Sequence, residues 1–112
     1  MKVKSGKKGT LHGSCADRLR AIGEETRLEV LRQLMQGAKT VGELNASLKL
    51  EQSLLSHHLR HLRDEGFVRA EKKGRLVFYS LSAEARSASV IPTLNLGCCE
   101  LAFDSAIKSR KS

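Results

Sequence analysis

The stretch EQSLLSHHLRHLRDEG, residues 51–66, decides the fold of this chain. Leu55, Leu59 and Leu62 recur at spacings of four and three, which places them on one face of an α-helix. The remaining positions are mostly polar or basic, and Gly66 is typical of a helix end. The stretch therefore predicts a helix with one face buried in a core and the opposite face open to a polar partner.

Shorter helices are expected before this stretch. Ser14 is placed to cap a helix over about residues 15–22. Leucines at helical spacing predict a second helix after it. Thr40 and Glu43 have the spacing of a capping box, which predicts a third, short helix over about residues 40–47. A brief turn then leads into the helix of the leucine repeat.

The stretches FVRAEKK (67–73) and RLVFYSL (75–81) alternate or run apolar around Gly74, which predicts a two-stranded hairpin. Two short helices joined by a tight turn and followed by a hairpin are typical of a winged helix-turn-helix. We therefore expect a mainly helical α+β fold, with this DNA-binding domain over residues 14–81. Residues 1–13 are expected to form a flexible basic arm, and residues 82–112 a C-terminal dimerisation and sensing segment with a basic tail.

The segment after residue 81 is harder to interpret. Ser82 could cap a helix, although the serines and β-branched residues that follow weaken it. The stretch TLNLGCCELAF, residues 93–103, fits a strand or an irregular segment better than a helix, because it contains Gly97 and follows Pro92.

Charge and length limit the function. The 112 residues suffice for one domain, and 20 Lys and Arg against 12 Asp and Glu give a net charge of +8, which indicates a polyanionic partner. No apolar run approaches the ~20 residues of a membrane span, and the N-terminus does not resemble a secretory signal. We therefore expect a cytoplasmic protein with no membrane partner. Reduced thiols are the rule there, so three cysteines argue against a structural disulfide framework.

The polar face of the leucine-repeat helix and the basic tip of the hairpin are the expected DNA-binding surface. Early positions of such a helix point at bases, and later arginines suit phosphates. The hairpin tip suits contact with the DNA backbone or the minor groove. The candidates are Gln52, Ser53, Ser56 and His57 for bases, Arg60 and Arg63 for phosphates, and Lys72, Lys73 and Arg75 on the hairpin. The alternative is that these side chains simply form a solvated polar surface.

Four segments, in this order, resemble the ArsR/SmtB family of metal- and thiol-responsive winged-helix repressors: TRLEVL (26–31), TVGEL (40–44), QSLLSHHLRHLRDEGFV (52–68) and GRLVFYSL (74–81). The resemblance covers about residues 19–81. It implies a homodimer that binds a palindromic double-stranded DNA operator and releases it when an inducer binds. Dimers of this family use their first and last elements as the interface, which would bring Cys15 near the C-terminal segment of either subunit.

The resemblance does not carry over the sensing sites most often found in the family. The frequent arsenic site needs Cys-x-Cys before the leucine-repeat helix, and the stretch GELNASL (42–48) has no cysteine. The zinc site on the last helix needs histidine, and no histidine follows Leu81. Three cysteines remain as candidate ligands: Cys15, Cys98 and Cys99.

Three thiolates favour a soft ion. Arsenite or antimonite, As(III) or Sb(III), suits a trigonal three-sulfur site best, and Cd(II), Pb(II) and Hg(II) are weaker candidates. Adjacent side chains diverge on a helix or a strand, so Cys98 and Cys99 can share an ion only if the chain turns, which Gly97 would ease. Cys15 is expected to complete the triad across the dimer interface, and His12 is a weak extra ligand.

Other functions remain open. A disulfide or polysulfide link from Cys15 to Cys98 or Cys99 would make the same scaffold a redox- or persulfide-sensing repressor. The thiols could also be apolar filling in the dimer interface. From another class, the fold could serve as a protein-interaction module that does not bind DNA. An enzyme is not expected, because no nucleophile, base and orienting group occur together.

Overall fold

The computed structural model of this chain describes residues 13–86 and 93–103. The helices are α1 (Cys15–Ile22), α2 (Glu25–Leu34), α3 (Val41–Leu48) and α4 (Gln52–Asp64). The strands are β1 (Lys39–Thr40), β2 (Val68–Lys73), β3 (Leu76–Leu81), β4 (Thr93–Asn95) and β5 (Glu100–Ala102). None of the described helices is long and apolar enough to cross a lipid bilayer.

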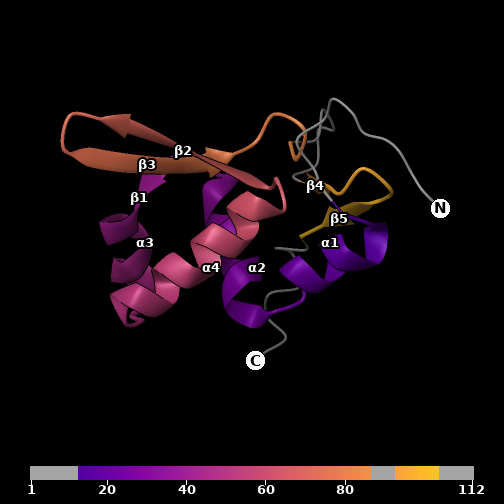
Figure 1. Cartoon of the computed structure of the whole chain (residues 1–112), viewed down its shortest axis with the longest axis horizontal. Coiled ribbons are helices and arrows are strands. Elements are labelled where there is room, and N and C mark those ends of the chain that lie inside the picture. The colour runs from indigo at the N-terminus through magenta and orange to yellow at the C-terminus, as the bar shows by residue number, and fades with distance from the viewer. Residues whose placement is uncertain (1–12, 87–92, 104–112) are drawn as a thin grey trace.

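The helices and the β2–β3 hairpin form a winged helix-turn-helix, as the sequence predicts. The three-stranded sheet is antiparallel in the order β1-β3-β2, with Ala70 opposite Tyr79. Gly74 turns the hairpin at a φ of 64°, which favours glycine. The hairpin projects beyond the helices as a wing, while α1 lies with β4 and β5 at the other end of the molecule (Figure 1).

The core forms around α4. Its leucines 55, 59 and 62 are fully buried, which confirms the leucine repeat as the core face of the helix. They belong to one apolar cluster with side chains from α2, α3, the β2–β3 hairpin and the C-terminal segment. The fully buried members include Leu31, Leu34, Leu44, Phe67, Leu94 and Leu96. This cluster fixes α4 so that its opposite face is held at the surface.

Capping boxes set the start of two helices. Ser14 and Asp17 bond reciprocally across the first turn of α1, and Thr40 and Glu43 do the same at α3. Each box satisfies backbone N–H groups that have no partner within the helix. Both caps were predicted from the sequence, and they place α1 and α3 within one residue of their expected bounds.

The turn between α3 and α4 depends on a residue in the left-handed region. Lys49 has a φ of 57° and a ψ of 46°, and it is the one non-glycine residue with positive φ among those that the structure describes. Its N–H donates to the carbonyl oxygen of Asn45, and the Asn45 side chain accepts from Leu50 N–H at 2.7 Å. These bonds hold the angle at which α4 leaves α3.

Lys49→Gly is expected to raise the free energy of unfolding by about 0.5–1 kcal/mol, because glycine adopts this conformation without a clash from Cβ. Lys49→Ala removes the same charge but keeps Cβ, so it should show no such gain. Urea denaturation of both variants at equal protein concentration checks this. Equal stability of the two variants would contradict the proposed strain.

The expected helix from Ser82 is wrong within the described residues, because residues 83–85 form a turn. Ser82 N–H donates to Phe67 O at 2.9 Å, and its hydroxyl donates to Gly66 O at 2.7 Å. These long-range bonds tie the chain to the end of α4. Beyond it, β4 and β5 pair with Leu94 opposite Leu101, so the strand expected near residues 93–103 is confirmed as a short hairpin.

Candidate DNA interface and cysteine site

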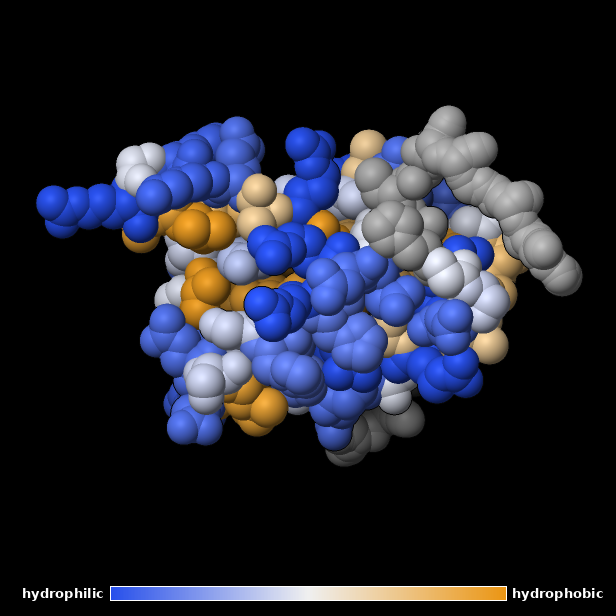
Figure 2. Space-filling model, viewed as in Figure 1, coloured by the Kyte–Doolittle hydropathy of each residue, from blue (hydrophilic) through white to orange (hydrophobic). Residues whose placement is uncertain are grey.

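The outer face of α4 brings six of the predicted DNA-binding residues together. All six are exposed, and with one residue of β3 they line an open hollow of about 700 Å³. Figure 2 shows hydrophilic side chains over this part of the molecule and along the projecting wing. The lining consists of Gln52, Ser53, Ser56, His57, Arg60, Arg63 and Tyr79. Donors and acceptors therefore line a single exposed groove on the helix face opposite the core.

The wing carries the other three predicted residues. Lys72, Lys73 and Arg75 are exposed around the turn at Gly74. The ammonium of Lys73 lies 5.8 Å from the centre of the Phe78 ring, a cation–π contact that orients it on the hairpin. The wing thus presents cations away from the core, beyond the α4 face.

Tyr79 was not singled out by the sequence analysis. It lies in β3 between Lys39 and Ala70, is partly buried, and lines the same hollow as the α4 side chains. The alternation of LVFYSL could have indicated it, because Val77 and Tyr79 must share one face of the strand while Phe78 takes the other.

Of the α4 histidines, His58 faces inward with 8% of its surface exposed. Its Nδ1 lies 3.2 Å from Nη1 of Arg27 and 4.0 Å from a carboxylate oxygen of Glu24. Arginine only donates, so Nδ1 accepts and the ring is neutral. Burial lowers the pKa of His58 most strongly. The charges of Glu24 and Arg27 act in opposite directions, Glu24 raising the pKa and Arg27 lowering it.

The free energy of unfolding is expected to fall as the pH drops below about 6.5, the ordinary pKa of histidine. The unfolded chain then takes up a proton at His58 that the folded chain, with its lowered pKa, takes up only at lower pH. The loss should level off below the folded-state pKa. Urea denaturation from about pH 8 to pH 5 checks this against His58→Gln. Parallel curves for the two proteins would show that His58 does not contribute.

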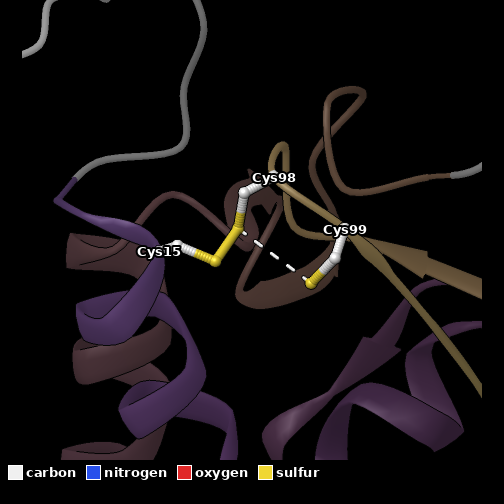
Figure 3. Close-up of side chains that lie close together, drawn as sticks. All are labelled: Cys15, Cys98 and Cys99. Carbon is white, nitrogen blue, oxygen red and sulfur yellow. Dashed lines mark hydrogen bonds between the residues drawn. A yellow bond between two sulfur atoms is a disulfide. The ribbon is translucent and has the colours of Figure 1, made fainter.

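The three cysteines meet at one place, although Cys15 is far from the other two in sequence (Figure 3). Cys15 begins α1, and Cys98 and Cys99 lie at the turn between β4 and β5. Cys15 and Cys98 form a disulfide with a Cα–Cα distance of 6.0 Å. Cys99 is free and exposed, and its Sγ lies 4.0 Å from that of Cys98. All three sulfur atoms lie within 4.8 Å of one another.

The hairpin turn explains how adjacent cysteines can face the same point. Gly97 has a φ of 90°, and its N–H donates to the side chain of Asn95 at 2.9 Å. Leu96 N–H donates to the carbonyl oxygen of Cys99 at 2.8 Å, which closes the turn. The local turn that the sequence analysis required is therefore present, and it presents both sulfurs toward the start of α1.

One expectation about the cysteines was wrong: their number argued against a structural disulfide, yet Cys15 and Cys98 form one. The rival expectation, a link from Cys15 to Cys98 or Cys99, matches this bond. The approach across a dimer interface was expected without deciding which subunit supplies Cys15. In the structure Cys15 joins Cys98 of the same chain, because the β4–β5 turn lies beside the first turn of α1 (Figure 3). His12, the weak extra ligand, lies outside the described residues.

The donor set fits a soft ion once the Cys15–Cys98 bond is reduced. Cys15 is partly buried, while Cys98 and Cys99 are exposed, so an ion could enter from solvent. Within residues 13–86 and 93–103, this is the one group of His, Cys, Asp or Glu side chains close enough to hold an ion. No nitrogen or carboxylate belongs to it, which disfavours hard ions.

The winged helix-turn-helix, the exposed polar helix face and the basic wing define a DNA-binding transcriptional regulator rather than an enzyme. Comparison with known proteins agrees. Residues 24–70 match the model of the bacterial regulatory protein, arsR family. The chain is 42% identical over 72 residues to the transcriptional activator HlyU of Vibrio cholerae, covering 64% of this chain and 67% of HlyU. This protein belongs to the ArsR family.

Other known proteins are also similar to this chain. The arsenical resistance operon repressor of Bacillus subtilis is 35% identical over 68 residues, covering 60% of this chain and 65% of the relative. A structure of reduced HlyU from V. cholerae matches with a TM-score of 0.58 and 43% identity, covering 61% of this chain and 72% of that one. The homodimeric winged helix-turn-helix domain of Mb0332 from Mycobacterium bovis matches with a TM-score of 0.58 and 26% identity, covering 62% and 64%.

Proposed function

We propose that this protein is a homodimeric repressor that binds operator DNA and releases it when a soft metalloid binds to Cys15, Cys98 and Cys99. The observation that carries the proposal is the convergence of three sulfur atoms within 4.8 Å from two ends of the chain. Three thiolates at one point are a donor set for a soft, thiophilic ion. The cytoplasm, where thiols stay reduced, is the compartment in which such a site would work.

The DNA side of the proposal rests on the α4 groove and the wing. The N-terminal half of α4 supplies the residues for base edges: Gln52, Ser53, Ser56 and His57. Arg60 and Arg63 would bind phosphates farther along the groove, and the wing cations would bind the neighbouring backbone. A two-fold symmetric dimer would present two such helices, so the operator would be palindromic.

Arsenite or antimonite is the inducer that the site favours. A trigonal ion needs three sulfurs and no further ligand, which is the number that this cluster offers. Cd(II), Pb(II) and Hg(II) are softer-metal alternatives with the same preference for thiolate. The likeness to the arsenical resistance operon repressor supports the shared DNA-binding scaffold, while the choice of a metalloid rests on the three sulfurs.

The mechanism would be differential binding. An ion held by all three sulfurs fixes the β4–β5 turn against the first turn of α1, whereas DNA favours the arrangement that best presents α4 and the wing. If the two arrangements differ, the ion lowers DNA affinity, and DNA lowers ion affinity by the same factor.

Fluorescence anisotropy of the reduced protein on its own upstream DNA, titrated with arsenite, tests the proposal. We expect arsenite to release the wild-type protein. Cys99→Ser should bind DNA normally but need at least about tenfold more arsenite, because a two-sulfur site remains. Cys99 suits this test because it lies outside the disulfide and is exposed. Unchanged DNA binding at saturating arsenite would reject the proposal.

A thiol redox switch is the second candidate, and the disulfide between Cys15 and Cys98 favours it. A low-molecular-weight disulfide or polysulfide would be the two-electron oxidant. One of its S–S bonds breaks as the Cys15–Cys98 bond forms, and the two thiol protons pass to the two sulfur products released. The likeness to HlyU, which has been studied in a reduced form, is compatible with this chemistry. Cys99→Ser separates the two functions, since it should need more arsenite for release but keep any response to oxidant.

A further inference from the structure

A network of polar side chains connects α1, which carries Cys15, to α4. Arg27 in α2 lies between them and is partly buried. Its Nε donates to the carbonyl oxygen of Ala21, and its Nη2 donates to that of Arg20 at 3.5 Å. Both acceptors are in the last turn of α1, so one guanidinium holds the end of that helix.

The same guanidinium reaches the recognition helix. Nη1 of Arg27 lies 3.2 Å from Nδ1 of His58, which is buried in the middle of α4. The neighbouring residue on α4 is His57, one of the side chains lining the DNA groove, and the two imidazole rings lie 5.9 Å apart. Arg27 therefore contacts both the helix that bears a cysteine and the helix that would read DNA.

Glu24 is the third member of this network. Its carboxylate accepts from the backbone N–H of Arg27 at 2.8 Å, as the cap of α2, and lies 4.0 Å from His58 Nδ1. The guanidinium of Arg27 is planar and holds its N–H donors at fixed angles. A movement that changes its contact with α1 therefore also changes its contact with His58. A lysine has its three donors on one nitrogen, so it lacks the separate Nε, Nη1 and Nη2 that contact α1 and His58 here.

These contacts attach α1 at both of its ends. It has eight residues, which is about 12 Å of helix. Cys15 links its first turn to the β4–β5 turn, and the carbonyl oxygens of its last turn bind Arg27. When the sulfur partners of Cys15 change, a shift of α1 must either move the guanidinium or break its contact with His58.

We infer that Arg27 is the positioning residue through which the cysteine site acts on the recognition helix, with His58 as the receiving group on α4. The inference rests on the proposed function, since it names the route by which thiol chemistry at Cys15 reaches DNA. It requires the Arg27–His58 contact to differ between the reduced, ion-bound and disulfide states of the protein.

The test compares Arg27→Lys with Arg32→Lys, the same substitution on the same helix. Arg32 pairs with Glu29 of its own helix, and neither α1 nor α4 contributes to that pair. We expect arsenite to weaken DNA binding of wild type and Arg32→Lys by roughly 5–150-fold, and that of Arg27→Lys by less than about twofold. Arsenite affinity in the absence of DNA should be similar in all three proteins. A full response in Arg27→Lys would overturn the inference.

Two further measurements keep the test decisive. If Arg27→Lys fails to fold, His58→Leu decides, because leucine suits the buried position and removes the acceptor. If arsenite has no effect on wild-type DNA binding, the proposed function fails, and nitrogen signals of the His58 ring in NMR decide the inference alone. A difference between the reduced and disulfide forms that is lost in Arg27→Lys would uphold it, and identical signals in both wild-type forms would overturn it.

Discussion

Leu59→Ala is expected to lower the free energy of unfolding by roughly 2–5 kcal/mol, the cost of deleting buried methyl groups and leaving a cavity. Leu59 is fully buried in the middle of α4, in the cluster that joins α4 to α2, α3 and the wing. A loss of this size is a large fraction of the stability of a small domain. DNA binding should fall with it, because the core face of α4 holds the opposite face in position.

Leu54→Ala is the matched control on the same helix. The residue has 42% of its surface exposed, so its removal should change the free energy of unfolding by no more than about 0.5 kcal/mol. Urea denaturation followed by circular dichroism measures both variants at one protein concentration, since dimerisation makes stability depend on concentration. Similar losses for the two variants would show that burial on α4 does not determine stability.

Neutralising the wing by Lys72→Ala, Lys73→Ala and Arg75→Ala together is expected to weaken DNA binding for all sequences alike. The slope of log affinity against log salt should become shallower by roughly 0.9 for each phosphate that the variant no longer neutralises, or about 2.7 for the three cations of one wing and about 5.4 for both wings of a dimer. Anisotropy on specific and unrelated duplexes over a salt series measures the slope.

Arg20→Gln is the charge control for the wing variant. Its side chain is exposed on α1, and α1 lies at the opposite end of the molecule from the wing (Figure 1). The variant should keep the wild-type salt slope. If it lowers the slope as much as a wing residue does, net charge rather than the wing governs DNA binding.

Local signals were enough to predict the helix-turn-helix. The spacing of Leu55, Leu59 and Leu62 gave the buried face of α4, and the serine and threonine caps gave the starts of α1 and α3. The turn at Gly74 gave the wing. Each depends on residues a few positions apart, where propensity and periodicity act directly.

Long-range contacts explain what the sequence did not predict. Ser82 could have capped a helix, but its bonds to Gly66 and Phe67 come from chain fifteen or more residues away and hold a turn instead. The family resemblance implied that Cys15 comes near the C-terminal cysteines, but no local signal indicates that the β4–β5 turn of the same chain lies beside it. Helical spacing put His57 on the polar face of α4 and left His58 off it, but nothing in the sequence indicates that Arg27 contacts His58.

The bond between Cys15 and Cys98 also changes how the chain bears mechanical load. The two residues are 83 positions apart, so the bond closes a covalent ring that contains the four helices of the described residues and the wing. A pull on the two ends of the oxidised chain passes from one cysteine to the other and leaves the DNA-binding domain without tension. After reduction, the same pull runs through every helix and strand in series. An unfoldase that pulls on the basic C-terminal tail would therefore meet a covalently closed loop in the oxidised protein and an open linear chain in the reduced protein.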